Sequence, residues 1–90
     1  VERSRDAVAV IRANLETLHL TGEATLHCVD VLAALKALGA TFDVIVADPP
    51  YDDTTLAEAI LACCAAPGGP LADGGLLAVT GRTRPLLCHR

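Results

Sequence analysis

The chain has 90 residues, a net charge of −4 and a hydrophobic content of 52%. This length allows at most one small domain. The acidic balance argues against this segment alone being a nucleic-acid-binding surface, because phosphate binding is driven by clustered Lys and Arg. No apolar run approaches the roughly 20 residues of a membrane span, and no signal-peptide pattern is present, so we expect a cytoplasmic protein.

The cysteines and histidines carry no metal-ligand pattern. The spacing of the four cysteines lacks the two-residue gap of a zinc knuckle, and the three histidines show no ligand spacing either. We therefore predict no metal site and interpret the cysteines as small apolar core residues in a reducing compartment. The cysteines are Cys28, Cys63, Cys64 and Cys88.

The first part of the chain predicts a strand end, a helix and a second strand. Residues 1–3 have the pattern of the end of a strand, and Ser4 is a suitable N-cap. Apolar residues recur at helical spacing over residues 5–19, which predicts an amphipathic helix that a turn at 21–23 ends. Residues 24–29 are predicted to form the second strand, closing at Asp30.

The middle of the chain predicts a short helix and then a central strand. The helix is expected over residues 31–38 and ends at Gly39. Residues 42–47 are apolar, rich in β-branched side chains and almost uncharged. Such a run predicts a strand of a parallel sheet that is buried on both faces.

The last part continues the alternation. Asp52 or Asp53 can cap a helix over residues 54–66, and a turn at 71–74 leads to a strand at 75–80. The end of the chain, 81–90, has no clear period and is expected to be loop with a possible helical turn. The order of elements predicts an α/β fold with a Rossmann-like, doubly wound and mostly parallel sheet.

A distinctive turn, Asp48-Pro49-Pro50-Tyr51, follows the central strand. Two prolines supply no backbone N–H and push the preceding residue out of the helical region, so the strand must end at Asp48. The turn therefore stands at the carboxyl end of a strand, where open α/β sheets bind their ligands. The alternative is a plain strand-ending turn in which Tyr51 covers a hydrophobic edge.

This turn, in this context, resembles the Asp-Pro-Pro-Tyr motif of the S-adenosylmethionine-dependent amino-methyltransferases. The chain is most similar to the bacterial family of small-subunit ribosomal RNA guanine-N2 methyltransferases, because the segments 1–3, 11–15, 42–51 and 71–76 occur in the same order and at similar spacing. The resemblance covers essentially the whole chain. It implies methyl transfer to the 2-amino group of a guanine, with ribosomal RNA or a small-subunit assembly intermediate as partner.

The motif has a chemical rationale as a catalytic site. An exocyclic amine has its lone pair delocalised into the base, and the Asp48 carboxylate and the Pro49 carbonyl can each accept one of its hydrogens. Pro50 presents a second carbonyl, and Tyr51 offers a flat face for an extruded base. The methyl donor is already activated, so neither a metal nor a covalent nucleophile is needed.

Acids at the other strand ends are candidates for cofactor binding. An acid at the position of Glu2 accepts hydrogen bonds from ribose hydroxyls in nucleotide-binding α/β folds. The resemblance implies that Asp30, with the Val31 backbone beside it, contacts the adenine amine of S-adenosylmethionine, and that Asp48 also belongs to the cofactor site. The alternative is that Glu2 and Asp30 merely cap the helices that follow.

Two departures from the family pattern limit the expectation. The family's glycine-rich loop would lie before Val1, and Gly81-Arg82 stands where the family commonly has an acidic residue and a histidine. Residues 1–90 are therefore interpreted as a partial methyltransferase domain without the first strand, that loop and the last strands. We expect this piece alone neither to bind the cofactor tightly nor to turn over.

Two other functions stay open on the sequence. A DNA adenine or cytosine amino-methyltransferase can use the same motif. A catalytically inactive remnant that acts as an interaction module is also possible, because half a doubly wound sheet exposes strand edges and an apolar face.

Overall fold

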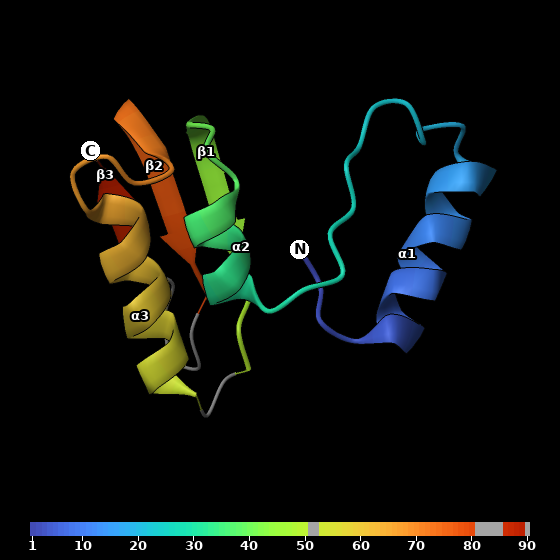
Figure 1. Ribbon diagram of the computed structural model, residues 1–90, viewed down its shortest axis with the longest axis horizontal. Coiled ribbons are helices and arrows are strands. Elements are labelled where there is room, and N and C mark those ends of the chain that lie inside the picture. The colour runs from blue at the N-terminus through green and yellow to red at the C-terminus, as the bar shows by residue number, and fades with distance from the viewer. Residues whose placement is uncertain (51–52, 81–85, 90) are drawn as a thin grey trace. The chain divides into compact units, whose positions relative to one another are not determined.

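The computed structural model describes residues 1–50 and 53–80, together with the backbone of residues 86–89. The chain divides into two compact units, Val1–Ala34 and Leu35–Arg90, which are described one at a time. Figure 1 shows the elements in chain order. They are α1 (Arg5–Thr17), α2 (Val31–Ala37), β1 (Phe42–Ala47), α3 (Thr54–Ala65), β2 (Leu71–Val79) and β3 (Leu86–His89).

The predicted first helix is confirmed as α1, and so is its cap. The Ser4 hydroxyl accepts a hydrogen bond from the Ala7 N–H at 3.3 Å. The helix ends at Thr17, before the turn at 21–23 that was predicted to end it. The reversal comes from His19, whose φ of 57° lies in the left-handed region, and the Leu20 N–H returns to the Leu15 carbonyl at 2.8 Å. These are the features of a Schellman motif.

The two strands predicted in the first unit are not formed. Residues 1–3 and 24–29 are extended but have no strand assignment. One backbone hydrogen bond joins them, from the Glu2 N–H to the His27 carbonyl at 2.9 Å, and the Cys28 thiol lies 3.8 Å from the Arg3 carbonyl. A strand needs a ladder of successive bonds, so these contacts align the segments without making a sheet.

The second unit contains a three-stranded sheet in the order β1-β2-β3. β1 and β2 are parallel, and β3 is antiparallel to β2. The predicted loop or helical turn over residues 86–89 is therefore wrong, since this apolar segment pairs with the free edge of β2. The α/β class, compatible with a partial Rossmann-like fold, is confirmed. The predicted stop of α2 is confirmed as well, because Gly39 has a φ of 63° just beyond that helix.

A bulge interrupts the pairing of β1 with β2. The prediction placed a turn at 71–74, but β2 already begins at Leu71, opposite Phe42. The next pair is Val44 with Leu76, so β1 advances by two residues while β2 advances by five. Gly74 makes this possible with a φ of 79°. Beyond the bulge the pairing is regular to the ends of both strands.

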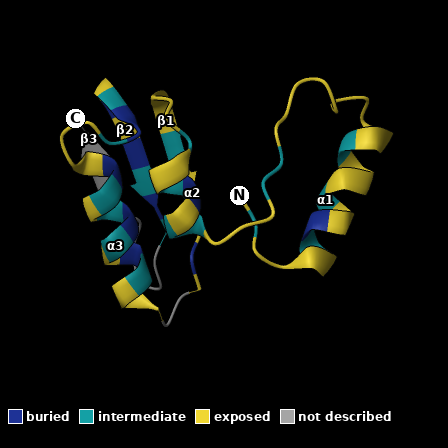
Figure 2. Cartoon of the chain, viewed as in Figure 1, coloured by how far each residue is buried: buried dark blue, intermediate teal, exposed yellow. Residues whose placement is uncertain are grey.

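The core of the second unit lies between α3 and one face of the sheet. Figure 2 shows the buried residues concentrated on α3 and β2. The most deeply buried side chains are Cys64, Leu71, Leu77 and Val79. β1 was predicted to be buried on both faces, which is wrong: Val44 and Val46 are 63% and 70% exposed. Side chains alternate along a strand, and these two share the face opposite Ile45, the half-buried residue between them.

Candidate active site

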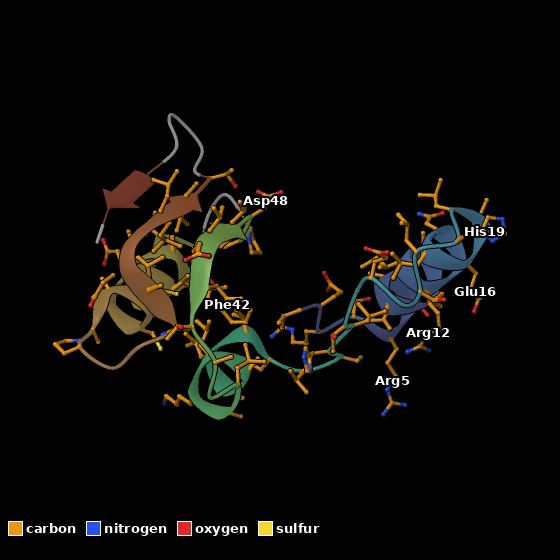
Figure 3. All side chains as sticks on the ribbon, turned by 90° about the horizontal axis from the view of Figure 1, so that it is seen from above. Arg5, Arg12, Glu16, His19, Phe42 and Asp48 are labelled. Carbon is orange, nitrogen blue, oxygen red and sulfur yellow. The ribbon has the colours of Figure 1, made fainter. Side chains whose placement is uncertain are left out.

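Asp48 and Thr80 stand side by side at the carboxyl ends of the parallel strands. β1 ends at Ala47 and β2 ends at Val79, and these two residues are register partners. The Thr80 N–H continues the ladder by donating to the Ala47 carbonyl at 2.9 Å. Figure 3 shows Phe42 and Asp48 at opposite ends of β1. The first residue after each strand is therefore held at the same edge of the sheet.

The Thr80 hydroxyl holds the Asp48 carboxylate. It donates a hydrogen bond to Asp48 Oδ1, and the Ala47 carbonyl lies 3.4 Å from the same hydroxyl. A hydroxyl has a single proton, and a carboxylate is the stronger acceptor. One carboxylate oxygen is thus fixed, while the exposed Asp48 side chain keeps acceptor capacity toward solvent.

The two prolines of the motif have different roles. Pro49 is buried and Pro50 is exposed. The Pro50 carbonyl accepts from the Asp53 N–H at 3.0 Å, and Asp53 Oδ1 caps α3 by accepting from the Leu56 N–H at 2.9 Å. Asp53 is thus the cap that the sequence left open between two acids. No described residue donates a hydrogen bond to the Pro49 carbonyl. Tyr51 and Asp52 lie outside the described residues.

Glu2 and Asp30 belong to the first unit, whereas Asp48 belongs to the second. Glu2 Oε1 accepts from the Ser4 N–H at 3.0 Å. Asp30 Oδ2 accepts from the Ala33 N–H at 3.3 Å, at the start of α2. Asp30 therefore makes the contact that the plain capping interpretation expects, whereas Glu2 binds the N–H of Ser4, the residue that itself caps α1. Their cofactor roles, and that of the half-buried Val31 beside Asp30, stay predictions.

The other acids, histidines and cysteines of the described residues do not make a metal site. In residues 1–50 and 53–80, no three His, Cys, Asp or Glu side chains are grouped so that they could hold a metal ion. Cys64 is fully buried in the core, as predicted, whereas Cys28 is exposed. None of the described helices is long and apolar enough to cross a membrane.

Sequence reasoning missed Thr80 as part of the site. A signal was available, because Thr80 is the last residue of the predicted strand at 75–80, and Asp48 directly follows the predicted strand at 42–47. That signal is weak unless the pairing register of the two strands is known, since Asp48 and Thr80 meet only if the last residues of the strands are paired with each other. The bulge in β2 decides the register, and it is not visible in the periodicity.

The site and the fold define a class of protein: an α/β protein with an exposed carboxylate at the carboxyl ends of its parallel strands, the edge where such sheets bind ligands. The family described as "Conserved hypothetical protein 95" matches residues 1–85. The chain belongs to this family, which is methyltransferase-like. Searches of curated proteins and of solved structures found no match.

Proposed function

We propose that the protein containing this chain transfers a methyl group from S-adenosylmethionine to the exocyclic 2-amino group of a guanine in small-subunit ribosomal RNA. The observation that carries the proposal is the placement of Asp48 and Pro49 directly after β1, at the carboxyl edge of the sheet. Membership of a methyltransferase-like family supports the reaction class. The resemblance of the motif and its surrounding segments supports the guanine amine as acceptor.

The chemistry follows from the two acceptors at the site. The Asp48 carboxylate and the Pro49 carbonyl each accept one N–H of the substrate amine, so that its lone pair is directed away from the ring system. Positive charge that develops on the nitrogen during transfer is stabilised by the carboxylate. The Pro50 carbonyl is already used in the turn to Asp53, which leaves the pair Asp48 and Pro49 for this task.

The acids of the chain suit the proposed cofactor. S-adenosylmethionine supplies a methyl group already activated on a sulfonium sulfur. The local bond of Glu2 uses Oε1 and that of Asp30 uses Oδ2. A carboxylate accepts several hydrogen bonds, so each acid can still bind a ligand. Glu2 would accept from the ribose hydroxyls of the cofactor, and Asp30, with Val31 beside it, from the adenine amine. Asp48 would contact both the cofactor and the substrate amine.

The test is a transfer assay on the natural protein that carries this sequence. The protein is incubated with methyl-labelled cofactor and, separately, with small ribosomal subunits lacking the modification, with naked small-subunit RNA and with duplex DNA. Nucleoside analysis of the product identifies the methylated atom. We expect label on guanine N2 in the RNA. Label on adenine or cytosine in DNA would favour the rival enzyme, and no transfer to any substrate would favour the inactive interaction module.

Replacement of Asp48 distinguishes catalysis from folding. We expect Asp48→Asn to lower kcat by roughly 100-fold to 1,000-fold, because one preorganised charge at the reacting centre is lost. The matched control is Asp53→Asn, five positions away, since Asn caps helices as well as Asp does and Asp53 serves α3. Equal activity of the two variants would remove Asp48 from the mechanism.

A further inference from the structure

We infer that Thr80 is a positioning residue for the reaction: its hydroxyl fixes the Asp48 carboxylate in the orientation that receives the substrate amine. The effect of Thr80 on catalysis rests on the proposed function, whereas the hydrogen bond between Thr80 and Asp48 does not. It extends the site from one strand to two, because Thr80 follows β2 and Asp48 follows β1.

Backbone hydrogen bonds between the two strands bring Thr80 and Asp48 together. The Ala47 and Val79 pair ends the regular ladder, and the Thr80 N–H adds one more bond to the Ala47 carbonyl at 2.9 Å. Thr80 is thereby held in place independently of its side chain. From that position its hydroxyl donates to Asp48 Oδ1.

A purely structural role for the hydroxyl is a poorer account of the geometry. The Ala47 carbonyl already has the Thr80 N–H as a donor, so it does not need the hydroxyl 3.4 Å away. Asp48, in contrast, has an exposed side chain, and among the described residues Thr80 is the only one that donates a hydrogen bond to its carboxylate. Without Thr80, the carboxylate would be able to populate several staggered rotamers.

Fixing one oxygen of a carboxylate directs the other. With Oδ1 bound to Thr80, Oδ2 is the carboxylate acceptor that remains for the substrate amine. The benefit of such an acceptor depends on its being oriented before the reaction starts. Supporting hydrogen bonds behind a reactive group supply that orientation.

The kinetic test compares two substitutions in the natural protein. Thr80→Val keeps the shape and removes the hydroxyl, whereas Thr80→Ser keeps the hydroxyl. We expect the Val variant to lose roughly 10-fold or more in kcat, which corresponds to the loss of one hydrogen bond to a charged group. The Ser variant should recover most of the rate. Full activity of the Val variant would overturn the inference.

A spectroscopic test does not depend on activity. The chemical shift of the Asp48 side-chain carboxyl carbon is measured by NMR in the unaltered protein and in the same two variants. It should move with Thr80→Val and stay close to its original value with Thr80→Ser. The control is Thr41→Val, next to the other end of β1, which should leave the shift unchanged. If the shift is insensitive to Thr80→Val, the positioning role is wrong, even in an active enzyme.

The kinetic and NMR tests distinguish a failure of the proposed function from a failure of the positioning role of Thr80. An unaltered protein that methylates nothing, but shows the expected carboxyl shift, contradicts the proposed function and not the Asp48–Thr80 contact. An active protein in which neither kcat nor the shift responds to Thr80→Val contradicts the positioning role alone.

Discussion

The two units of the chain hold the acids of the candidate site in different ways. In the first unit, Glu2 and Asp30 bond to backbone N–H groups two and three residues further along the chain. In the second unit, Asp48 is held by a hydroxyl 32 residues away. An acid fixed by its own neighbours is specified locally, whereas the orientation of Asp48 is a product of the tertiary fold. The better-defined part of the candidate site is therefore in the second unit.

The two units also differ in how many large apolar side chains they bury. The second unit buries several large apolar side chains completely between α3 and β2. In the first unit, the buried side chains among the described residues are Val8 and Ala34. Apolar burial is the main source of stability, so the second unit should resist unfolding more than the first.

The largest effect should come from the core of the second unit. Leu77 is 0% exposed, and Leu77→Ala should lower the free energy of unfolding by about 3 kcal/mol through lost burial and a cavity. In the first unit, Val8→Ala should lower it by about 1.5 kcal/mol, because only two methyl groups are removed. Urea unfolding measures both. An equal loss in the two variants would contradict the difference between the units.

Gly75 tests the bulge that sets the register of β2. A Cβ atom there would lie 2.8 Å from the Ala72 carbonyl oxygen and 3.0 Å from that of Asp43. These are backbone atoms, so Gly75→Ala should cost about 2 kcal/mol through overpacking. Gly22→Ala is the control in the first unit, since nothing lies within 4 Å of a Cβ atom at Gly22. Thermal unfolding of the two variants should differ clearly. Equal stabilities would mean that the bulge adapts freely.

The helix caps offer a matched pair across the units. Asp53→Ala removes the acceptor for the Leu56 N–H, and Ser4→Ala removes the acceptor for the Ala7 N–H. Each should destabilise its helix by about 1 kcal/mol. Hydrogen exchange in the first turns of α3 and α1 reports the effects separately. If exchange at α1 does not respond to Ser4→Ala, that helix end is already frayed in the unaltered protein.

The smallest expected effect is a gain. His19 adopts a φ of 57°, which strains an L-residue. His19→Gly should relieve this strain and stabilise the first unit by about 0.5 kcal/mol after the entropy of the more flexible unfolded chain is included. His27→Gly is the control, because His27 has no positive φ and should gain nothing. A lower melting temperature for His19→Gly would show that the imidazole makes a contact that stabilises the turn.

Local signals in the sequence predicted the helices well. The spacing of apolar residues located α1 and α3, with Ser4 predicted as the cap of α1 and Asp52 or Asp53 as the cap of α3, and Gly39 marked the end of α2. Each of these features depends on residues within one or two turns of helix. The end of α1 was the exception, because His19 took the left-handed position that is more often filled by Gly.

Strands were harder to predict, since a strand exists only with its partner. Residues 24–29 have the composition of a strand but make one backbone bond to residues 1–3. Residues 86–89 lack a clear period, yet they pair with β2. The burial of β1 was overestimated for a similar reason: an apolar strand can bury both faces only where something covers both, and Val44 and Val46 are exposed.

The candidate site was predictable in part. Asp48, Pro49 and Pro50 were identified as candidates because the short motif that contains them directly follows an apolar strand. The different roles of the two carbonyls were not predictable, since the bond between Pro50 and Asp53 depends on the turn geometry. Thr80 was missed because its position depends on a bulge that shifts β2 against β1.

The separation of Asp48 and Thr80 along the chain also has a consequence for folding kinetics. The contact joins residues 32 positions apart, with the whole of α3 in the segment between them. Closing such a loop has an entropic cost that must be met before the two strands gain from pairing. Helix α3 can form early from local interactions, but the oriented carboxylate arises only once β2 has joined β1. During synthesis, the site therefore stays incomplete until Thr80 has emerged from the ribosome.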